Sequence, residues 1–399
     1  MPLTDPYYKK TVEYKHEDKT LKFNLSQDLF SSQTIDHGTS RLLRTFIFEK
    51  VNKYKKVLDL GCGVGPIGIT LKAICPDAEI HMVDRDALAL RYSRDNAKLN
   101  NFSEGIKVYG SLGYNSVTDT DFDLIVSNIP AKVGEEALTH IIKDAQNHLV
   151  KDGRVVIVVV DAINEFIKTS LESDDNIEIL YQKSWPGHHV YHFSFISNEN
   201  NKIDTDKDKF YRQDNSFEYK GREIILKTSH NLPEFDQLSF DTKRTLSYLK
   251  KIKGNPTNFI VFNPGQGYIP LAITRQFLAK NITLIDRDLL ALKTSKENLI
   301  RYDYPEESIT TKHQIDLEVN DKEADLVIGL IPEKQNVDLY QMYLEQINSN
   351  LKKDGQTLLA SSSTVITRIE DIVSKMDSFN VVYRERHKGR SILLLKKVH

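Results

Sequence analysis

The first half of the chain alternates between short apolar runs and longer segments in which leucine and alanine recur at helical spacing. Short apolar runs are typical of buried parallel strands, and the periodic segments predict helices. The predicted strands are Val57–Leu60, Glu79–Val83, Ile106–Tyr109, Phe122–Ser127 and Arg154–Val160, and the predicted helices are Pro66–Ile74, Ala87–Leu99 and Glu135–Leu149. Strands that alternate with helices predict an α/β fold with a doubly wound, mostly parallel sheet.

An antiparallel pair is predicted to close this sheet. Ile177–Gln182 and Val190–Ile196 are strand-like, and Trp185-Pro186-Gly187 between them is typical of a turn. In a doubly wound sheet the ligand crevice lies at the carboxyl ends of the strands. We therefore look for the chemistry of this chain among the residues that follow each predicted strand.

Several segments of the first half recur in the same order in the second half. Val83–Leu90 returns as Ile285–Leu292, and Lys151–Gly153 returns as Lys353–Gly355. The spacing between the copies is nearly constant, which chance matches would not keep. The repeat predicts a tandem duplication of one domain.

Residues 198–209 separate the two copies and are rich in Asn, Asp and Lys, with almost no apolar side chains. Such a segment cannot bury enough surface to fold alone, so it predicts a linker or a long loop. We therefore predict a first domain over residues 1–197, a linker over 198–209 and a duplicated domain over 210–399.

The composition is that of an ordinary globular protein: 399 residues, 40% hydrophobic and 28% charged, with a formal net charge of -2. The near-neutral charge does not by itself indicate a polyanionic partner, and the local clusters of Lys and Arg suit a solvated surface. The longest apolar stretch is too short to span a membrane, and the first residues lack the apolar core of a secretion signal. We expect a cytoplasmic protein.

The sequence offers little to a metal ion. Its two cysteines, Cys62 and Cys75, stand in no metal-binding pattern. His188, His189 and His192 cluster on the closing pair, but strand alternation sends the first two to opposite faces. We expect surface histidines and no bound metal.

A glycine-rich stretch follows the first predicted strand. Gly61, Gly63 and Gly65 lie between Val57–Leu60 and the helix that begins at Pro66. Glycines at this place let backbone N–H groups approach a nucleotide closely, although a tight turn without any ligand uses them too. Asp84 ends the second strand, from where a carboxylate can accept ribose hydroxyls in dehydrogenases and methyltransferases alike.

Asp59 separates these two classes. Dinucleotide-binding loops usually lack an acid just before their glycines, whereas Asp59-Leu60-Gly61-Cys62-Gly63 resembles motif I of class I S-adenosylmethionine (SAM)-dependent methyltransferases. The resemblance implies two tandem Rossmann-like methyltransferase domains with SAM as cofactor. It implies that Asp59 orients the loop and the methionine amino group, that Asp84 holds the ribose and that Ser111 flanks adenine. The implied cofactor-binding residues are Asp59, Gly61, Cys62, Gly63, Gly65, Asp84, Ser111 and Asn128.

Asn128 and Pro130 are the candidate catalytic residues. Methyltransferases of exocyclic amines carry Asn-Pro-Pro and an aromatic ring here, and this chain carries Ile129 at the first proline and Ala131 at the ring. An aryl amine is a poor nucleophile, and a neutral Asn oxygen that accepts an amine hydrogen directs the lone pair toward the methyl group. The alternative is that Asn128 only caps a turn.

The lead-in to the first domain extends the resemblance. Phe30-Ser31-Ser32 and Asp36-His37-Gly38-Thr39 resemble the start of the methyltransferase small domain group, whose tandem members methylate guanine amines of ribosomal RNA. By the same resemblance Thr39 contacts the SAM carboxylate, and the alternative is a helix N-cap at this residue. Leu330 replaces Asn128 in the second copy, so we expect the first copy to be the active one.

The sequence thus predicts a SAM-dependent methyltransferase that modifies an exocyclic amine of RNA, first of all guanine in ribosomal RNA. Two alternatives stay open. The first is a methyltransferase that acts on a glutamine amide of a protein, since the same Asn-Pro arrangement serves that acceptor. A non-catalytic RNA-binding or assembly protein would keep the SAM pocket only as a structural remnant.

Overall fold

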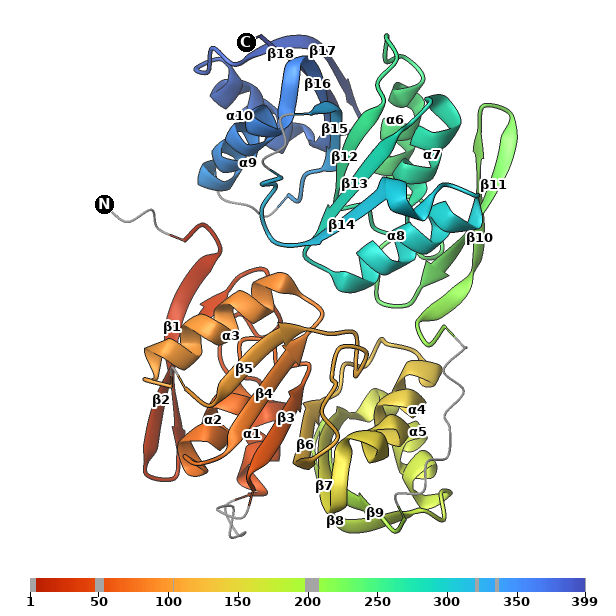
Figure 1. Ribbon diagram of the computed structural model, residues 1–399. Coiled ribbons are helices and arrows are strands. Elements are labelled where there is room, and N and C mark those ends of the chain that lie inside the picture. Colours follow the sequence, from red (N-terminus) through yellow and green to blue (C-terminus); the bar gives the residue numbers. More distant parts are fainter. Residues whose placement is uncertain are drawn as a thin grey trace. The chain divides into compact units, whose positions relative to one another are not determined.

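The computed structural model describes residues 5–46, 54–102, 104–197, 208–319, 323–333 and 337–398. These residues form two compact units, one of which spans Tyr7–Phe210, while the other contains the residues from Tyr211 onward (Figure 1). Most of the predicted linker over 198–209 lies outside the described residues. No helix within the described ranges is long and apolar enough to cross a membrane.

The first unit is built on a seven-stranded sheet in the order β5-β4-β3-β6-β7-β9-β8. Strand β9 pairs antiparallel with both β7 and β8, and the other neighbours are parallel. The strands are β3 (Lys56–Leu60), β4 (Glu79–Asp84), β5 (Ile106–Gly110), β6 (Phe122–Asn128), β7 (Leu149–Val160), β8 (Ile177–Trp185) and β9 (His188–Phe195). The predicted α/β class and the closing antiparallel pair are confirmed.

The helices of this unit form two groups. Helix α2 contacts both α1 and α3, and α4 contacts α5. The helices are α1 (His37–Arg44), α2 (Pro66–Ile74), α3 (Ala87–Leu99), α4 (Glu135–Lys143) and α5 (Asp161–Glu172). Buried aliphatic and aromatic side chains of the strands fill the space under α4 and α5.

One predicted helix is shorter than expected. The segment Glu135–Leu149 was expected to be a single helix, but α4 ends at Lys143 and a 3-10 helix follows at Asp144–His148. Strand β7 then begins at Leu149 rather than at Arg154. The sequence pattern missed the start of this strand because the residues before Arg154 are polar. The strand is also irregular there, since Asp152 has a positive φ of 64° and the pairing with β6 shifts register.

The second unit repeats the first. Its sheet has the order β14-β13-β12-β15-β16-β18-β17, with β18 antiparallel to both of its neighbours. Its strands are β12 (Asn258–Phe262), β13 (Asn281–Asp286), β14 (Ile309–His313), β15 (Ala324–Leu330), β16 (Leu351–Ser362), β17 (Phe379–His387) and β18 (Arg390–Lys397). Its helices are α6 (Phe240–Leu249), α7 (Tyr268–Gln276), α8 (Leu289–Arg301), α9 (Val337–Asn350) and α10 (Ser363–Val373), with a 3-10 turn at Glu306–Ser308. The predicted duplication is confirmed.

Each unit also carries an N-terminal hairpin that the apolar pattern did not reveal. The hairpins are β1 (Tyr8–His16) with β2 (Lys19–Ser26), and β10 (Tyr211–Tyr219) with β11 (Arg222–Ser229). Every second residue of β1 is exposed and several are lysines, so the segment resembles solvated surface. Tertiary contacts hold it in place.

A buried asparagine ties each hairpin to its unit. Asn96 on α3 accepts the N–H of Asn24 at 2.7 Å and donates to the carbonyls of Asn24 and Val64 at 3.1 and 2.9 Å. Asn298 on α8 makes the same three bonds to Lys227 and Gln266. Both side chains are fully buried, so their loss would leave backbone groups without partners.

We expect Asn96→Ala to release the first hairpin and leave the second one in place. Each orphaned buried group costs about 1–3 kcal/mol, so amide exchange should rise over Tyr8–Ser26 but not over Tyr211–Ser229. Asn298→Ala is the matched control and should give the opposite pattern. Hydrogen exchange read by mass spectrometry checks both variants, and equal exchange in the two hairpins would contradict the anchoring role.

Candidate active site

The glycine loop leaves the sheet at the carboxyl end of β3. Gly61, Gly63 and Gly65 all have a positive φ, of 79°, 56° and 87°. A Cβ added at Gly61 or Gly63 would meet no atom within 4 Å, whereas one at Gly65 would lie 2.9 Å from Ile69 Cδ1. The first two glycines therefore border open space, and Gly65 is needed for packing at the start of α2.

Asp59 is fully buried on β3 beneath this loop. Its Oδ2 accepts the N–H of Gly68 at 2.8 Å, while Oδ1 has no hydrogen-bond partner among the described residues. Burial raises the pKa of this carboxyl to about 7, against the lowering effect of the Gly68 bond. A buried acceptor without a donor is rare in folded proteins and indicates a place for a ligand donor.

Asp84 lies at the end of the neighbouring strand β4. Its Oδ2 accepts the N–H of Gly63 at 2.9 Å, and its Oδ1 accepts the N–H of Asp86 at 2.9 Å. Burial raises the pKa of Asp84 in spite of these bonds. The two bonds fix the carboxylate in one orientation, and its remaining lone pairs stay available to a ligand.

Two other predicted cofactor-binding side chains have partners within the protein. The buried thiol of Cys62 lies 3.4 Å from Ser93 Oγ. Ser111 Oγ donates to the carbonyl of Gly113 at 2.6 Å and accepts the N–H of Ser116 at 3.0 Å. These side chains stabilise the loops after β3 and β5, and their contact with a cofactor stays a prediction.

Asn128 ends β6, which pairs with β3 on the side away from β4. Its Nδ2 donates to Asp36 Oδ2 at 2.9 Å and to Thr39 Oγ1 at 3.1 Å. Asp36 is the N-cap of α1 and also accepts the N–H of Thr39 at 3.1 Å. The helix cap is therefore Asp36 and not Thr39, and Asp36 is a site residue that the sequence pattern did not single out as one.

The residues after Asn128 explain one departure from the family motif. Ile129 is buried and its N–H donates to the carbonyl of Val158 on β7 at 3.0 Å, a bond that a proline at this position could not make. Pro130, which follows, is exposed. Ile129 thus extends the pairing of β6 with β7 right up to the site.

The arrangement brings the predicted groups to one edge. Strands β4, β3 and β6 are consecutive and parallel, so Asp84, the glycine loop and Asn128 lie along their carboxyl ends. This edge is the usual ligand crevice of a doubly wound sheet. The distribution of the site along three strands is that expected from the sequence.

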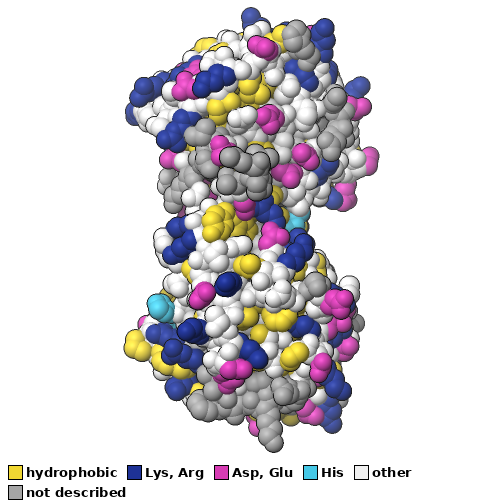
Figure 2. Space-filling view, turned by 90° about the vertical axis from the view of Figure 1, so that its left-hand side faces the viewer, with side chains coloured by type: hydrophobic (Ala, Val, Ile, Leu, Met, Phe, Trp, Pro, Cys, Tyr) yellow, Lys and Arg dark blue, Asp and Glu magenta, His cyan; other side chains and the backbone are white. Residues whose placement is uncertain are grey.

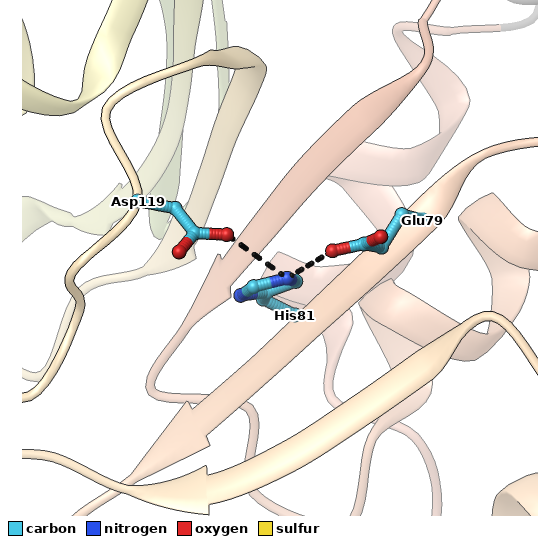
Figure 3. Close-up of side chains that lie close together, drawn as sticks. All are labelled: Glu79, His81 and Asp119. Carbon is cyan, nitrogen blue, oxygen red and sulfur yellow. Dashed lines mark hydrogen bonds and ion pairs between the residues drawn. The ribbon is translucent and has the colours of Figure 1, made fainter.

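A second cluster lies at the opposite end of β4, where Glu79, His81 and Asp119 point toward one another (Figure 3). His81 Nε2 is 2.6 Å from Glu79 Oε1. Lys107 lies 2.7 Å from the same Glu79 oxygen, and Lys56 lies 2.6 Å from Asp119 Oδ2. The bonds from Lys107 and His81 lower the pKa of Glu79 to about 2. Lys56 also lies 2.6 Å from Asp121 Oδ1, so each carboxylate of the cluster already has a lysine partner in an ion-pair network.

The three histidines of the closing pair have separate partners. His192 is buried, with Nε2 2.8 Å from Thr45 Oγ1, so the expectation that all three are surface residues is wrong for His192. His189 Nε2 lies 2.8 Å from Asp161 Oδ1, and His188 contacts Arg41. His192 became buried because α1 packs against β7 and β9, which the local pattern could not indicate.

Charge on the surface follows the composition. On the face drawn in Figure 2, basic and acidic side chains of the described residues are interspersed, with small apolar areas between them. This agrees with the formal net charge of -2. Any recognition of a polyanion would therefore depend on local groups rather than on a general field.

Three similarities place the chain among known proteins. The family model of the methyltransferase small domain matches residues 20–174. Protein YbxB of Bacillus subtilis (strain 168), which is uncharacterized, is 30% identical over 152 residues, covering 38% of this chain and 74% of that protein. Ribosomal RNA small subunit methyltransferase C of Haemophilus influenzae (strain PittEE) is 40% identical over 135 residues, covering 33% of this chain and 39% of that protein.

A solved structure has the same fold over almost the whole chain. It is the T. thermophilus 16S rRNA N2 methyltransferase (RsmC) in complex with AdoMet and guanosine, with a TM-score of 0.67 over 99% of this chain and 100% of that chain. The two sequences are 15% identical, so this likeness establishes the tandem fold alone.

The fold and the glycine loop with its two carboxylates define a class I SAM-dependent methyltransferase. Within that class, the chain belongs to the methyltransferase small domain family. The residues present fit the cofactor, because Asp59 Oδ1 lacks a donor and the space above Gly61 and Gly63 is open. The resemblance inferred from the motif at Asp59–Gly63 is confirmed.

We expect the carboxyl of Asp59 to make the ligand-free protein less stable as pH rises. Its folded-state pKa of about 7 lies above the ordinary value of 3.8, so the folded chain keeps a proton that the unfolded chain loses between these values. Asparagine has the shape of the neutral carboxyl. The unfolding temperature of the wild type should therefore fall relative to that of Asp59→Asn between about pH 4 and pH 7. Above about pH 7 the difference between the two unfolding temperatures should stay constant.

Thermal unfolding of the two proteins over this pH range checks the expectation. Asp175→Asn is the control, because it makes the same substitution at an exposed position of the same unit, away from the buried carboxyl. A pH-independent difference for Asp59→Asn would show that the buried carboxyl is ionised throughout.

Proposed function

We propose that this protein transfers a methyl group from SAM to an exocyclic amine of RNA, first of all the 2-amino group of guanine in ribosomal RNA. The observation that carries the proposal is the amide of Asn128, held at the carboxyl end of β6 beside the glycine loop. The ribosomal RNA methyltransferase that aligns with a third of this chain, and the guanosine in the T. thermophilus complex, support the choice of substrate.

Two carboxylates and two glycines would hold the cofactor. Asp59 Oδ1 is the unpaired acceptor for the ammonium group of SAM, and Asp84 accepts the ribose hydroxyls. Gly61 and Gly63 leave room for the nucleoside, because among the described residues no atom lies within 4 Å of a Cβ built at either glycine. When bound, SAM supplies an electrophilic methyl group on a sulfonium, which needs no metal and no strong base.

Asn128 would orient the acceptor amine. Its NH2 group is bonded to Asp36 and Thr39, so its Oδ1 is the atom left to accept an amine hydrogen. A hydrogen bond that draws this hydrogen out of the ring plane directs the nitrogen lone pair toward the methyl carbon. Pro130 is exposed beside it, and Ala131 supplies no ring, so a stacking contact worth roughly 1–3 kcal/mol must come from another side chain.

The second unit would not hold SAM. Val261 stands at the place of Asp59, and Pro270 stands at the place of Gly68, whose N–H the carboxylate accepts. Donor and acceptor are thus lost together, so neither replacement leaves the other's partner unsatisfied. An apolar pair replaces the acceptor that the cofactor ammonium needs.

Ion pairs cross the acceptor end of the second crevice. Leu330 ends β15, as Asn128 ends β6. Arg390, the first residue of β18, binds both carboxylate oxygens of Asp241 on α6 and also binds Glu333 after β15. We infer that these bonds join the elements between which a substrate amine would enter, and that one chain has one active site.

We expect one SAM molecule per chain and a clear asymmetry between matched aspartates. Asp84→Ala should weaken SAM binding at least tenfold, because it removes the ribose acceptor and the partner of the Gly63 N–H. Asp286→Ala changes the corresponding residue at the end of β13 and should leave the affinity unchanged. Isothermal titration calorimetry gives both the stoichiometry and the affinity, and two equivalent sites would contradict the proposal.

The substrate class is tested with radiolabelled SAM. We expect label in RNA after incubation with RNA and protein from cells, removable by ribonuclease and resistant to protease. Label that protease removes would instead support a protein amide substrate. No label together with intact SAM binding would support a non-catalytic protein.

Asn128→Ala separates binding from chemistry. The substitution should lower the turnover number by roughly a hundredfold and leave SAM affinity within about twofold, since Asn128 acts on the acceptor amine. Asn115→Ala is a control on the same unit, because Asn115 is exposed. Single-turnover kinetics with RNA measure the effect.

A further inference from the structure

We propose that Asp36 is a positioning residue, which fixes the orientation of the Asn128 amide so that Oδ1 faces the acceptor amine. The inference rests on the proposed function and concerns how that site is set up. An asparagine amide can turn about its last bond and exchange its oxygen for its NH2 group. Only one of these two orientations accepts a hydrogen from an amine.

The contacts of Asn128 decide between them. Asp36 Oδ2 lies 2.9 Å from Asn128 Nδ2, and an ionised carboxylate can only accept hydrogen bonds. The reversed amide would place its oxygen against the carboxylate oxygen, which is repulsive. Thr39 Oγ1, 3.1 Å from Nδ2, could serve either orientation, so the carboxylate makes the choice.

Asp36 is itself held in place by its surroundings. Its Oδ2 also accepts the N–H of Thr39 at 3.1 Å. A Cβ at Gly38 would lie 2.8 Å from this Asp36 oxygen and 2.7 Å from the ring of His188, so the close packing requires glycine. Arg41 on α1 donates to the carbonyl of Pro186 at 2.7 Å, which ties the helix to the closing hairpin.

The second unit shows that the N-cap residue itself need not carry a carboxylate, although Glu234 Oε1 accepts the N–H of Ser239 and the hydroxyl of Thr242 there. There the N-cap of α6 is Ser239, whose hydroxyl accepts the N–H of Thr242 at 3.1 Å. Strand β15, the counterpart of β6, ends at Leu330, which has no amide to orient. A carboxylate on the N-cap residue itself and an asparagine at the strand end thus occur together in the first unit, and the second unit has neither at these two positions.

The chemical consequence concerns the substrate amine. Its two hydrogens are donors, so they need an acceptor at Asn128, and the NH2 group of a reversed amide would meet them donor to donor. Because Asp36 holds the amide of Asn128 in the accepting orientation before the substrate binds, the amide does not have to be reoriented during the reaction. Asp36 acts through Asn128 and is not expected to touch the methyl donor.

The test is a double-mutant cycle that begins with Asp36→Ser. Serine keeps a helix cap, as in the second unit, but removes the carboxylate that faces Asn128. We expect turnover to fall roughly tenfold or more, with SAM affinity and thermal stability near those of the wild type. Ser239→Asp is the matched control in the second unit and should leave turnover unchanged.

The double variant distinguishes positioning from an independent role. If Asp36 acts through Asn128, adding Asp36→Ser to Asn128→Ala causes no further loss of turnover. Losses that multiply in the double variant, or wild-type turnover in Asp36→Ser, would overturn the inference and leave the proposed function intact. Wild-type turnover in Asn128→Ala would overturn the assigned role of Asn128, and the inference with it.

Discussion

The fully buried carboxylate of Asp59, with one oxygen bonded to Gly68 and the other without a partner, is the constraint around which the first unit is arranged. Such a group destabilises a folded chain unless a ligand completes it. Gly61 and Gly63 of the adjoining loop border open space, which leaves room for such a ligand. In the second unit, Val261 and Pro270 stand at the equivalent positions, so no buried carboxyl at these positions needs a ligand donor.

The comparison of the two units separates what builds the fold from what builds the site. Asn96 and Asn298 make the same three backbone bonds, and Asp123 and Asp325 each accept two backbone N–H groups where the first strand of the sheet begins. These contacts serve the fold in both copies. Around the crevice, Asp84 and Asp286 are shared, but Asp59 and Asn128 of the first unit are replaced by Val261 and Leu330 in the second, which supports the proposal of a single active site per chain.

Much of the architecture could be predicted from the chain itself. The helices Pro66–Ile74 and Ala87–Leu99 have the predicted bounds, because apolar spacing and first-turn residues define them locally. The first hairpin and the start of β7 were not predicted, because their burial depends on contacts with α3 and β6 rather than on a local apolar pattern. His192 was placed at the surface for the same reason, since Thr45 and α1 cover it.

The sequence by itself determined the tandem α/β fold, the class of cofactor and the strand ends at which the candidate site residues lie, because these depend on periodicity and on short motifs. Only the tertiary structure decided which way Asn128 points. Its partner Asp36 is far away in the chain, and the two meet because α1 packs against the end of the sheet. A hydrogen bond between such distant residues depends on the packed arrangement of whole elements, which no local pattern records.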